Sequence, residues 1–351
     1  MPEDFSKSRS PTRITKLDLS TKQNQERYDN FLNSIDNSLI HYSHKYLRFI
    51  ERVTESQLNL LVKEDDGAIQ AALPYFVRES PIGQVINSGA YFGSHGGPIG
   101  LNSYDCSQLL ETSKILEVSP KGIISTTLIT NPFSTFDLEE NFPTLIRVEE
   151  RKMQVSPIPN WSSDFFTSLL AQLHSKTRNI LRKSISGDIE IRNGIDELIV
   201  LEQLHVKTSI EMGRKHKNKI FFDAMLEHFR FDKDFLVLSA YTDDGDVIAS
   251  LLVFFYNDYV EYYIPAQSID GRKHQAMTRL IFEAFSIASE RGFKFWNWGG
   301  TRLDQESLLH FKSRWGTVDH DYAFFNTHFE GMQIDSDKAE QYFPGFYVAK
   351  R

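Results

Sequence analysis

The stretch NWGGTRLDQESLLHFKSRWGT, residues 297–317, holds the most specific pattern in this chain. It continues the run FKFWNW (293–298), whose short length and aromatic composition predict a strand. Residues 305–314 then have the apolar spacing of a short helix. The stretch therefore predicts a strand, a glycine pair, a helix with an aromatic-lysine pair and an aromatic-glycine pair after it: Gly299-Gly300, Phe311-Lys312 and Trp315-Gly316.

The rest of the second half alternates predicted helices and strands around one hairpin. The runs FLVLSAY and DVIASLLVFF flank the turn Asp243-Asp244-Gly245, and an Asp-Gly pair between β-rich runs is a strong hairpin signal. Periodicity then predicts strands at 188–192, 259–266 and 320–326, and helices at 161–184, 196–212, 221–231 and 274–291.

The first half repeats this order of elements. Its hairpin turns at Asp65-Asp66-Gly67, between LNLLVKE and AIQAALPYF. Helices are predicted at 26–35, 43–53 and 103–117, and further strands at 83–89, 123–129 and 144–155. The prolines of SPIPNW (156–161) interrupt both periodicities. We therefore expect a tandem duplication of one mixed α/β domain, with a disordered tail at 1–24, a first domain at 25–156 and a second domain at 157–351.

Composition narrows the class of protein. The chain has 351 residues, of which 40% are hydrophobic and 25% charged, and a formal net charge of −8. An acidic total argues against a surface that grips DNA. The single cysteine, Cys106, excludes an internal disulfide framework and a Cys-built zinc site, and we expect it to be a buried, inert thiol.

Membrane and metal signals are weak. No run approaches the roughly 20 apolar residues of a membrane span, and the N-terminus has no signal-peptide core. We expect a soluble, cytoplasmic protein with no integral membrane segment. His41 and His44 have His-x-x-His spacing without further ligands, so we expect no metal site.

The 297–317 stretch resembles the C-terminal signature of the FemABX-like (BioF2-like) tandem GNAT acyltransferases, in which a glycine pair precedes a helix bearing Phe-Lys and then an aromatic-Gly pair. The resemblance also covers NSGAYFGSHGGPIG (87–100), SLIHYSHKYLRFIE (38–51) and the helix at 176–183, and extends over roughly 30–330. Ala90 stands where a proline is common. The chain also lacks the helical hairpin insertion of the larger Fem proteins, which together with its acidic total favours a small thioester donor.

The resemblance implies an α/β fold of two GNAT domains and the transfer of an acyl or aminoacyl group to an amine of a cell-envelope or surface-glycan precursor. Acyl-CoA or aminoacyl-tRNA is the implied co-substrate, with no tightly bound cofactor, and the acceptor is a small-molecule or lipid-linked amino-sugar or peptide precursor. The lysine of the Phe-Lys pair, Lys312, is implied to lie near the transferring group, where a cation stabilises developing negative charge. The alternative is a surface lysine over Phe311 and Trp315. The signature also places Gly300, Thr301 and Phe311 among the candidate substrate-binding residues.

The donor site is expected beside the strand VEYYIPAQ (260–267). In this fold that strand separates from its neighbour and exposes backbone N–H groups, with Tyr263 among them. The following loop, SIDGRKHQAM (268–277), places Arg272 and Lys273 before a helix N-terminus, which suits the phosphates of a donor. The loop lacks the glycine pattern of acetyl-CoA-using GNAT enzymes, so an ordinary solvated turn is the alternative.

Two basic clusters stand out in the acidic chain. Opposed across a groove they suit a nucleotide, a pyrophosphate-linked sugar or a tRNA end. The alternative is that each is only a solvated face. The clusters are His174, Lys176, Arg178, Arg182 and Lys183 on a helix, and Arg214, Lys215, Lys217 and Lys219 in a loop, with Arg178, Arg182, Arg214 and Lys215 taken as substrate-binding.

Two further assignments remain open in the sequence. Trp296 and Trp298 lie in one strand, and we expect one to face the core and the other, Trp298, to face the substrate cleft. Glu261, Asp304 and His274 are general-base candidates, each of which we expect to be structural. The absence of an assignable base keeps a second hypothesis open, a non-catalytic GNAT-fold module that binds a glycan precursor or RNA.

Overall fold

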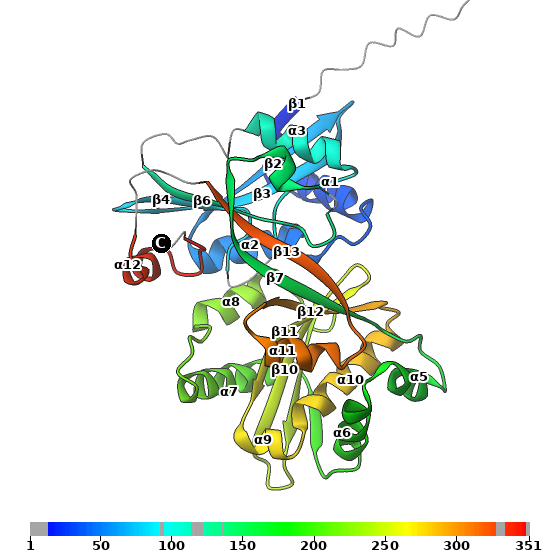
Figure 1. Ribbon diagram of the computed structural model, residues 1–351. Helices are drawn as coiled ribbons and strands as arrows, with labels where there is room; N and C mark the ends of the chain where they lie inside the picture. Colours follow the sequence, from blue (N-terminus) through cyan, green and yellow to red (C-terminus); the bar gives the residue numbers. More distant parts are fainter. Residues whose placement is uncertain are drawn as a thin grey trace, which may run out of the picture. The chain divides into compact units, whose positions relative to one another are not determined.

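The computed structural model describes residues 13–91, 95–113, 115, 122–134, 136–327 and 334–348. The chain divides into two compact units, one of residues 1–149 and 322–351 and the other of residues 150–321. Both boundaries fall inside strands, β7 (Leu145–Pro157) and β13 (Val318–Thr327). Figure 1 shows the elements of each unit.

Unit 1 is a mixed sheet with helices packed on it. Its strands are hydrogen-bonded in the order β1-β2-β3-β4-β6-β13, and all neighbours are antiparallel except β4 and β6, which are parallel. The elements are β1 Arg13–Lys16, α1 Lys22–Asn33, a 3₁₀ turn Ile40–Tyr42, α2 His44–Thr54, β2 Gln57–Asp65, β3 Ala68–Ser80, β4 Gly83–Asn87, β5 Ile99–Gly100, α3 Ser103–Ser113, β6 Ile123–Ile129, α4 Leu138–Asn141 and α12 Ser336–Tyr342, together with the end of β13.

Unit 2 repeats this sheet. Its strands follow the order β8-β9-β10-β11-β12-β7, again antiparallel throughout except for one parallel pair, β11 and β12. The elements after β7 are α5 Phe165–Gln172, α6 Ser175–Ile185, β8 Glu190–Asn193, α7 Glu197–Glu211, α8 Lys219–His228, β9 Phe235–Tyr241, β10 Val247–Tyr256, β11 Tyr259–Gln267, α9 Ile269–Lys273, α10 Ala276–Glu290, β12 Phe295–Arg302 and α11 Glu306–Ser313.

The predicted mixed α/β fold and its internal repeat are confirmed by this common strand order. The two predicted hairpins form, and their turn glycines, Gly67 and Gly245, have φ of +80° and +84°. Glycine adopts this left-handed backbone without steric strain, which is why the Asp-Gly pairs mark both turns.

The structure corrects the predicted domain limits. The last strand of each repeat joins the sheet of the other unit, because β7 pairs with β12 and β13 pairs with β6. Residues 322–351 therefore group with unit 1 and not with unit 2 as the sequence suggested. Within the stretch expected to be a disordered tail, Arg13–Lys16 pairs with β2 and α1 begins at Lys22.

The predicted long helix at 161–184 is wrong and forms two helices. The break is at Leu173 and His174, where the His174 N–H donates to the Arg314 carbonyl (3.0 Å) instead of to its own helix. The His174 side chain then accepts a hydrogen bond from the Lys176 N–H and caps α6. A hydrogen bond to a distant segment thus overrides a continuous helical pattern.

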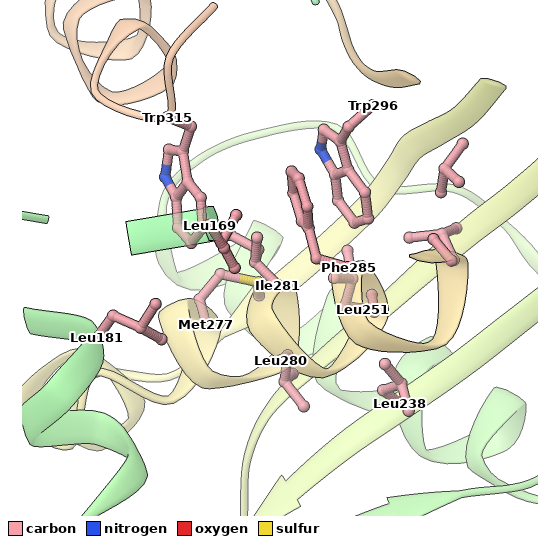
Figure 2. Packing of buried hydrophobic residues seen from close by; sticks show 14 of the residues in the cluster. Leu169, Leu181, Leu238, Leu251, Met277, Leu280, Ile281, Phe285, Trp296 and Trp315 are labelled. Carbon is pink, nitrogen blue, oxygen red and sulfur yellow. The ribbon is translucent and has the colours of Figure 1, made fainter. Parts of the chain in front are cut away.

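The core of unit 2 is built on α10 and its neighbouring strands. Figure 2 shows side chains of α10, among them Met277, Ile281 and Phe285, packed with Trp296 and Trp315. The Phe285 and Trp296 rings are stacked with centroids 4.4 Å apart. This packing holds α10 against the sheet and thereby positions the helix N-terminus beside β11.

None of the described helices is long and apolar enough to cross a membrane. Within the described residues no three His, Cys, Asp or Glu side chains are grouped as metal ligands would be. The Cys106 thiol is buried, and burial raises its pKa to about 12, so that it stays protonated.

Candidate active site

Strands β11 and β12 separate after three residue pairs. Their parallel register joins Tyr259 to Phe295, Val260 to Trp296 and Glu261 to Asn297, and within the described strands it goes no further. β11 continues to Gln267 paired on its other edge with β10, and β12 resumes pairing with β7 at Gly300. The sheet of unit 2 therefore opens at Glu261 and Asn297, as the sequence predicted for the strand at 260–267.

A pocket of about 510 Å³ lies in unit 2 beside this opening. Its wall is formed by the C-terminal ends of β11 and α7, the N-terminus of α10 and the Phe311 ring of α11. The lining residues are His205, Thr208, Ser209, Met212, Arg214, Lys215, Tyr262, Pro265, Ala266, Gln267, Arg272, Gln275, Met277, Thr278 and Phe311.

Three cationic side chains line the pocket. Arg214 and Lys215 come from the loop after α7, and Arg272 comes from α9. The segment predicted to be a loop forms this short helix, in which the N-cap Ser268 Oγ accepts a hydrogen bond from the Gly271 N–H and Gly271 packs directly on β10. A Cβ at Gly271 would lie 2.1 Å from the Ile248 carbonyl oxygen, so only glycine allows that approach. The predicted basic loop is thus close to the predicted donor strand.

The N-terminus of α10 also forms part of the pocket wall. No side chain caps that end of the helix, whose N-cap residue Gln275 has a left-handed φ of +56°. Gln275, Met277 and Thr278 line the pocket. The first N–H groups of a helix have no partner within it and carry partial positive charge, so this end suits an anionic group.

His205 is neutral in this setting. Burial, with smaller contributions from the nearby charges of Lys217 and His216, lowers its pKa to about 4. Its Nε2 accepts a hydrogen bond from the Lys217 backbone N–H (3.1 Å). An imidazole whose Nε2 is already an acceptor has only Nδ1–H to offer to a ligand.

Lys312 is a buried residue and not a surface lysine. Its side chain is 4% exposed, and its Nζ donates to Thr301 Oγ1 (2.6 Å) and to the Gly299 carbonyl (3.3 Å). Burial lowers its pKa to about 8, against the opposing influence of Glu261. Phe311, the preceding residue, lines the pocket. The aromatic-lysine pair thus contributes one wall residue and one buried cation.

Glu261 and Asn297 form a second polar pair at the opening. Glu261 is 5% exposed, and its Oε2 accepts a hydrogen bond from Asn297 Nδ2 (2.7 Å). Burial raises the pKa of the Glu261 carboxyl to about 8, while Lys312 and the Asn297 hydrogen bond act in the opposite direction. Glu261 and Lys312 are therefore two buried ionisable groups near the point where the strands separate, and each affects the pKa of the other.

Two predicted orientations are corrected. Trp298 is 1% exposed in the same apolar cluster as Trp296, and its Nε1 donates to Ser156 Oγ (2.9 Å). Residues two apart on a strand share a face, so both indoles point into the core. Tyr263 does not line the pocket: its ring packs against Phe221 and Phe254, with centroids 6.2 and 4.8 Å away, while its neighbour Tyr262 reaches the wall.

The other predicted site residues do not line the pocket. Arg178 and Arg182 lie on α6, which packs against α10, and neither lines the pocket, so the two basic clusters do not oppose each other there. Lys273 is exposed and pairs with Asp270 (2.7 Å). Gly300 and Thr301 lie on β12 and do not line the pocket, although Thr301 binds Lys312.

The glycine-rich stretch of unit 1 lies partly outside the described residues, since 92–94 are among those left out. In the described part, a Cβ at Gly97 would lie 2.4 Å from the Ile129 carbonyl oxygen. The Gly97 and Ile129 N–H groups both donate to Ser88 Oγ (3.1 and 2.8 Å). These contacts form a tight turn against β6.

Several residues of the site are not evident from the sequence. Asn297, His205 and Gln275 carry no signal there beyond their place in strand or helical patterns. Glu261 was expected to be structural. Its signal is a carboxylate inside the otherwise apolar and aromatic strand VEYYI, which is uncommon unless the carboxylate has a buried partner.

Residues 193–312 match the family described as acetyltransferase (GNAT) domain. No curated protein matches the chain by sequence. Among solved structures, FemX superposes with a TM-score of 0.69 at 14% identity, covering 93% of this chain and 99% of that one.

Two further structures share the fold over most of their length. A tandem GNAT protein from the clavulanic acid biosynthesis pathway has a TM-score of 0.51 at 10% identity, with 90% of this chain and 98% of that one covered. L-PGS from Bacillus licheniformis has a TM-score of 0.51 at 12% identity, with 87% and 91% covered. The chain thus has the tandem GNAT fold of FemX, as its signature led us to expect, and the sequence match to the GNAT domain family extends over residues 193–312.

Proposed function

We propose that unit 2 transfers an acyl or aminoacyl group from an activated donor to an amine of a cell-envelope or surface-glycan precursor in the cytoplasm. The observation that carries the proposal is the pocket of about 510 Å³ at the point where β11 leaves β12. Acyl transfer needs an anchored donor, a polarised carbonyl and a neutral amine. The pocket offers groups for the first two needs.

The positive charge of the pocket lining supports a role in binding the donor. Arg214, Lys215 and Arg272 line the pocket together with the N-terminus of α10, and this combination suits the phosphates of acyl-CoA or of a tRNA 3′ end. The similar tandem GNAT protein is described in a form without acetyl-CoA, so acetyl-CoA is one thioester donor to test. FemX and L-PGS share the fold, as does the C-terminal domain of a putative lysylphosphatidylglycerol synthetase from Agrobacterium fabrum, which favours an aminoacyl donor.

Carbonyl polarisation is assigned to the free edge of β11 and to Lys312. Within the described residues the register of β11 with β12 ends at Glu261, so the backbone N–H groups that point to this edge of β11 are the candidates to bind an acyl oxygen; Pro265 has no N–H. Lys312 is held on β12, the other strand of the opening. A desolvated ammonium at this point stabilises negative charge that develops on the acyl oxygen.

The test is turnover with both donor classes. The protein is incubated with labelled acyl-CoA or charged tRNA and with amino-sugar nucleotides or peptide precursors, and N-acylated product is detected by mass spectrometry. Product formation with one donor class identifies the donor. Absence of both turnover and donor binding, with the protein folded, would refute the proposal.

A second candidate function is a non-catalytic module that binds a glycan precursor or RNA. It is favoured by one observation: among the described residues that line the pocket there is no Asp or Glu, and His205 Nε2 is already an acceptor. Calorimetry separates the two functions. Acceptor affinity without donor affinity supports the binding module, and donor affinity supports the transferase.

A further inference from the structure

Glu261 and Asn297 are the last residue pair that joins β11 to β12. The side chains of both are buried, and they lie on the face of the sheet opposite to Trp296 and Trp298, which pack in the apolar core. The Asn297 Nδ2 donates to Glu261 Oε2 (2.7 Å). A side-chain hydrogen bond therefore joins the two strands at the point where their backbone register ends.

A chain of hydrogen bonds continues from this pair to Lys312. Asn297 Oδ1 accepts from the Gly299 N–H (2.9 Å), and the Gly299 carbonyl accepts from Lys312 Nζ (3.3 Å). Gly299 has a left-handed φ of +70°, at a register shift in the pairing of β12 with β7. The Asn297 side chain thus fixes a backbone segment that has left regular strand geometry, and that segment binds the lysine.

Electrostatic interaction is a second link between Glu261 and Lys312. No ion pair within 4.0 Å joins Glu261 to Lys312 in the described part of the chain, yet each opposes the other's burial-driven pKa shift. On the elements around them, Lys152 of β7 pairs with Asp319 (3.0 Å), and His310 of α11 contacts Arg314 (2.7 Å). Asn297 and Gly299 connect the Glu261 carboxyl to Lys312, and the ionised form of that carboxyl favours the Lys312 ammonium.

We propose that Glu261 is a positioning residue: through Asn297 and Gly299 it holds Lys312 at the opening of the strands. When ionised, its carboxylate also favours the charged form of Lys312. Glu261 acts through Lys312 and does not touch the substrate. The role rests on the proposed function, in which the Lys312 cation stabilises charge on the acyl oxygen. A buried carboxylate costs stability unless its partners compensate it, and Asn297 and Lys312 are those partners.

The first measurement needs no substrate. In protein labelled with ¹³C and ¹⁵N at lysine, NMR follows the Lys312 Nζ resonance through a pH titration, and its loss in Lys312→Met assigns it. Glu261→Gln removes the charge but keeps the length of the side chain, so the pKa of Lys312 should fall. Glu290→Gln, on the exposed end of α10, is the matched control and should leave that pKa unchanged.

The second measurement separates position from charge. Glu261→Asp keeps the carboxylate but is one methylene too short for the 2.7 Å bond to Asn297, so the Lys312 pKa should stay near that of the wild type while kcat falls. Misplacing a catalytic group by about 1 Å lowers kcat by up to roughly 100-fold. The KM for the donor should change little, because the donor pocket is lined by other residues.

The outcomes are distinguishable. A wild type without turnover refutes the proposed function, and the NMR titration alone then decides the role of Glu261. An unchanged Lys312 pKa in folded Glu261→Gln overturns the proposal. If Glu261→Gln does not fold, Glu261→Asp decides, because a displaced Lys312 Nζ should change its chemical shift even where its pKa stays the same. Wild-type kcat in that variant, or for an inactive wild type an unchanged Lys312 Nζ chemical shift, overturns the proposal equally.

Discussion

Lys312 Nζ lies 2.6 Å from Thr301 Oγ1, so that a lysine of helix α11 is bound to the end of strand β12. The neighbouring residue, Phe311, lines the pocket and meets Trp298 edge-on, with ring centroids 5.9 Å apart. One short helix therefore supplies both an apolar wall and a buried cation to the candidate site. Five predictions follow, four from this site and one from the buried His41 of unit 1.

Lys312→Met keeps the aliphatic stem and removes the charge. If the ammonium stabilises the acyl oxyanion, turnover should fall by roughly 10²–10³, as for the loss of one oxyanion donor. Donor affinity should change less than turnover, because the contact is made mainly in the transition state. Single-turnover kinetics and calorimetry measure the two effects. Wild-type turnover in this variant would remove Lys312 from the mechanism.

The same substitution should also lower stability, which the sequence alone did not suggest. The Gly299 carbonyl and Thr301 hydroxyl lose their buried donor in Lys312→Met. A buried polar group left without its partner costs about 1–3 kcal/mol. Denaturant unfolding measures this loss, and Lys312→Arg tests whether another cation restores the contacts.

Arg272→Ala and Arg214→Ala should each weaken donor binding. Both residues line the pocket, and losing one charge-assisted contact to a phosphate is expected to raise the donor Kd roughly tenfold with kcat little changed. Lys273→Ala is the matched control, because Lys273 is adjacent in sequence but pairs with Asp270 outside the pocket. Equal effects at Arg272 and Lys273 would contradict a phosphate site in this pocket.

Gly271→Ala should destabilise the donor side of the pocket. The added Cβ would lie 2.1 Å from the Ile248 carbonyl oxygen, so α9 has to move away from β10. Such overpacking costs about 1–3 kcal/mol and shifts Arg272 with the helix. Gly187→Ala is the control, since its Cβ would find only ordinary contacts at 3.6 Å and beyond. Melting temperatures of the two variants provide the comparison, and equal values would show that α9 is not packed so closely.

Acid should destabilise the protein through His41. This residue is buried in unit 1, and burial lowers its pKa from 6.5 to about 3. Between these two values the unfolded chain binds more protons than the folded one, so stability falls as the pH is lowered from about 6.5 towards 3. The slope from one such group is at most about 1.4 kcal/mol per pH unit.

His41→Asn should remove that contribution. Denaturant unfolding of the variant and the wild type at several pH values measures the two slopes. The variant should lose less stability than the wild type on acidification. Parallel stability curves for the two proteins would show that His41 is protonated equally in the folded and unfolded chains.

Local elements were predictable from the sequence because their causes are local. The Asp-Asp-Gly turns predict both hairpins, and the aromatic run at 293–298 predicts the start of β12. The 297–317 signature also pointed to Lys312 and Phe311, which the structure places on one helix at the opening of the sheet. Turn chemistry and hydrophobic period act within a few residues, so no distant partner was needed to read them.

The side-chain environments were less predictable. The sequence left Lys312 between an active-site cation and a surface lysine, and the structure buries it against Thr301. Trp298 was assigned to the cleft, but its ring lies in the core. Whether a side chain is exposed depends on the elements packed over it, and these come from parts of the chain more than a hundred residues away, as in the bond from Trp298 to Ser156.

The sequence by itself determined the mixed α/β units, their repeat and the residues of the signature. Only the tertiary structure decided that each unit takes its last strand from the other repeat, that the helix at 161–184 breaks at His174, and that Glu261, Asn297 and Lys312 share one network. The physical reason is the same in each case. A strand edge, a helix end and a buried charge all have hydrogen-bonding groups that need partners, and the chain brings those partners from distant positions only when it folds.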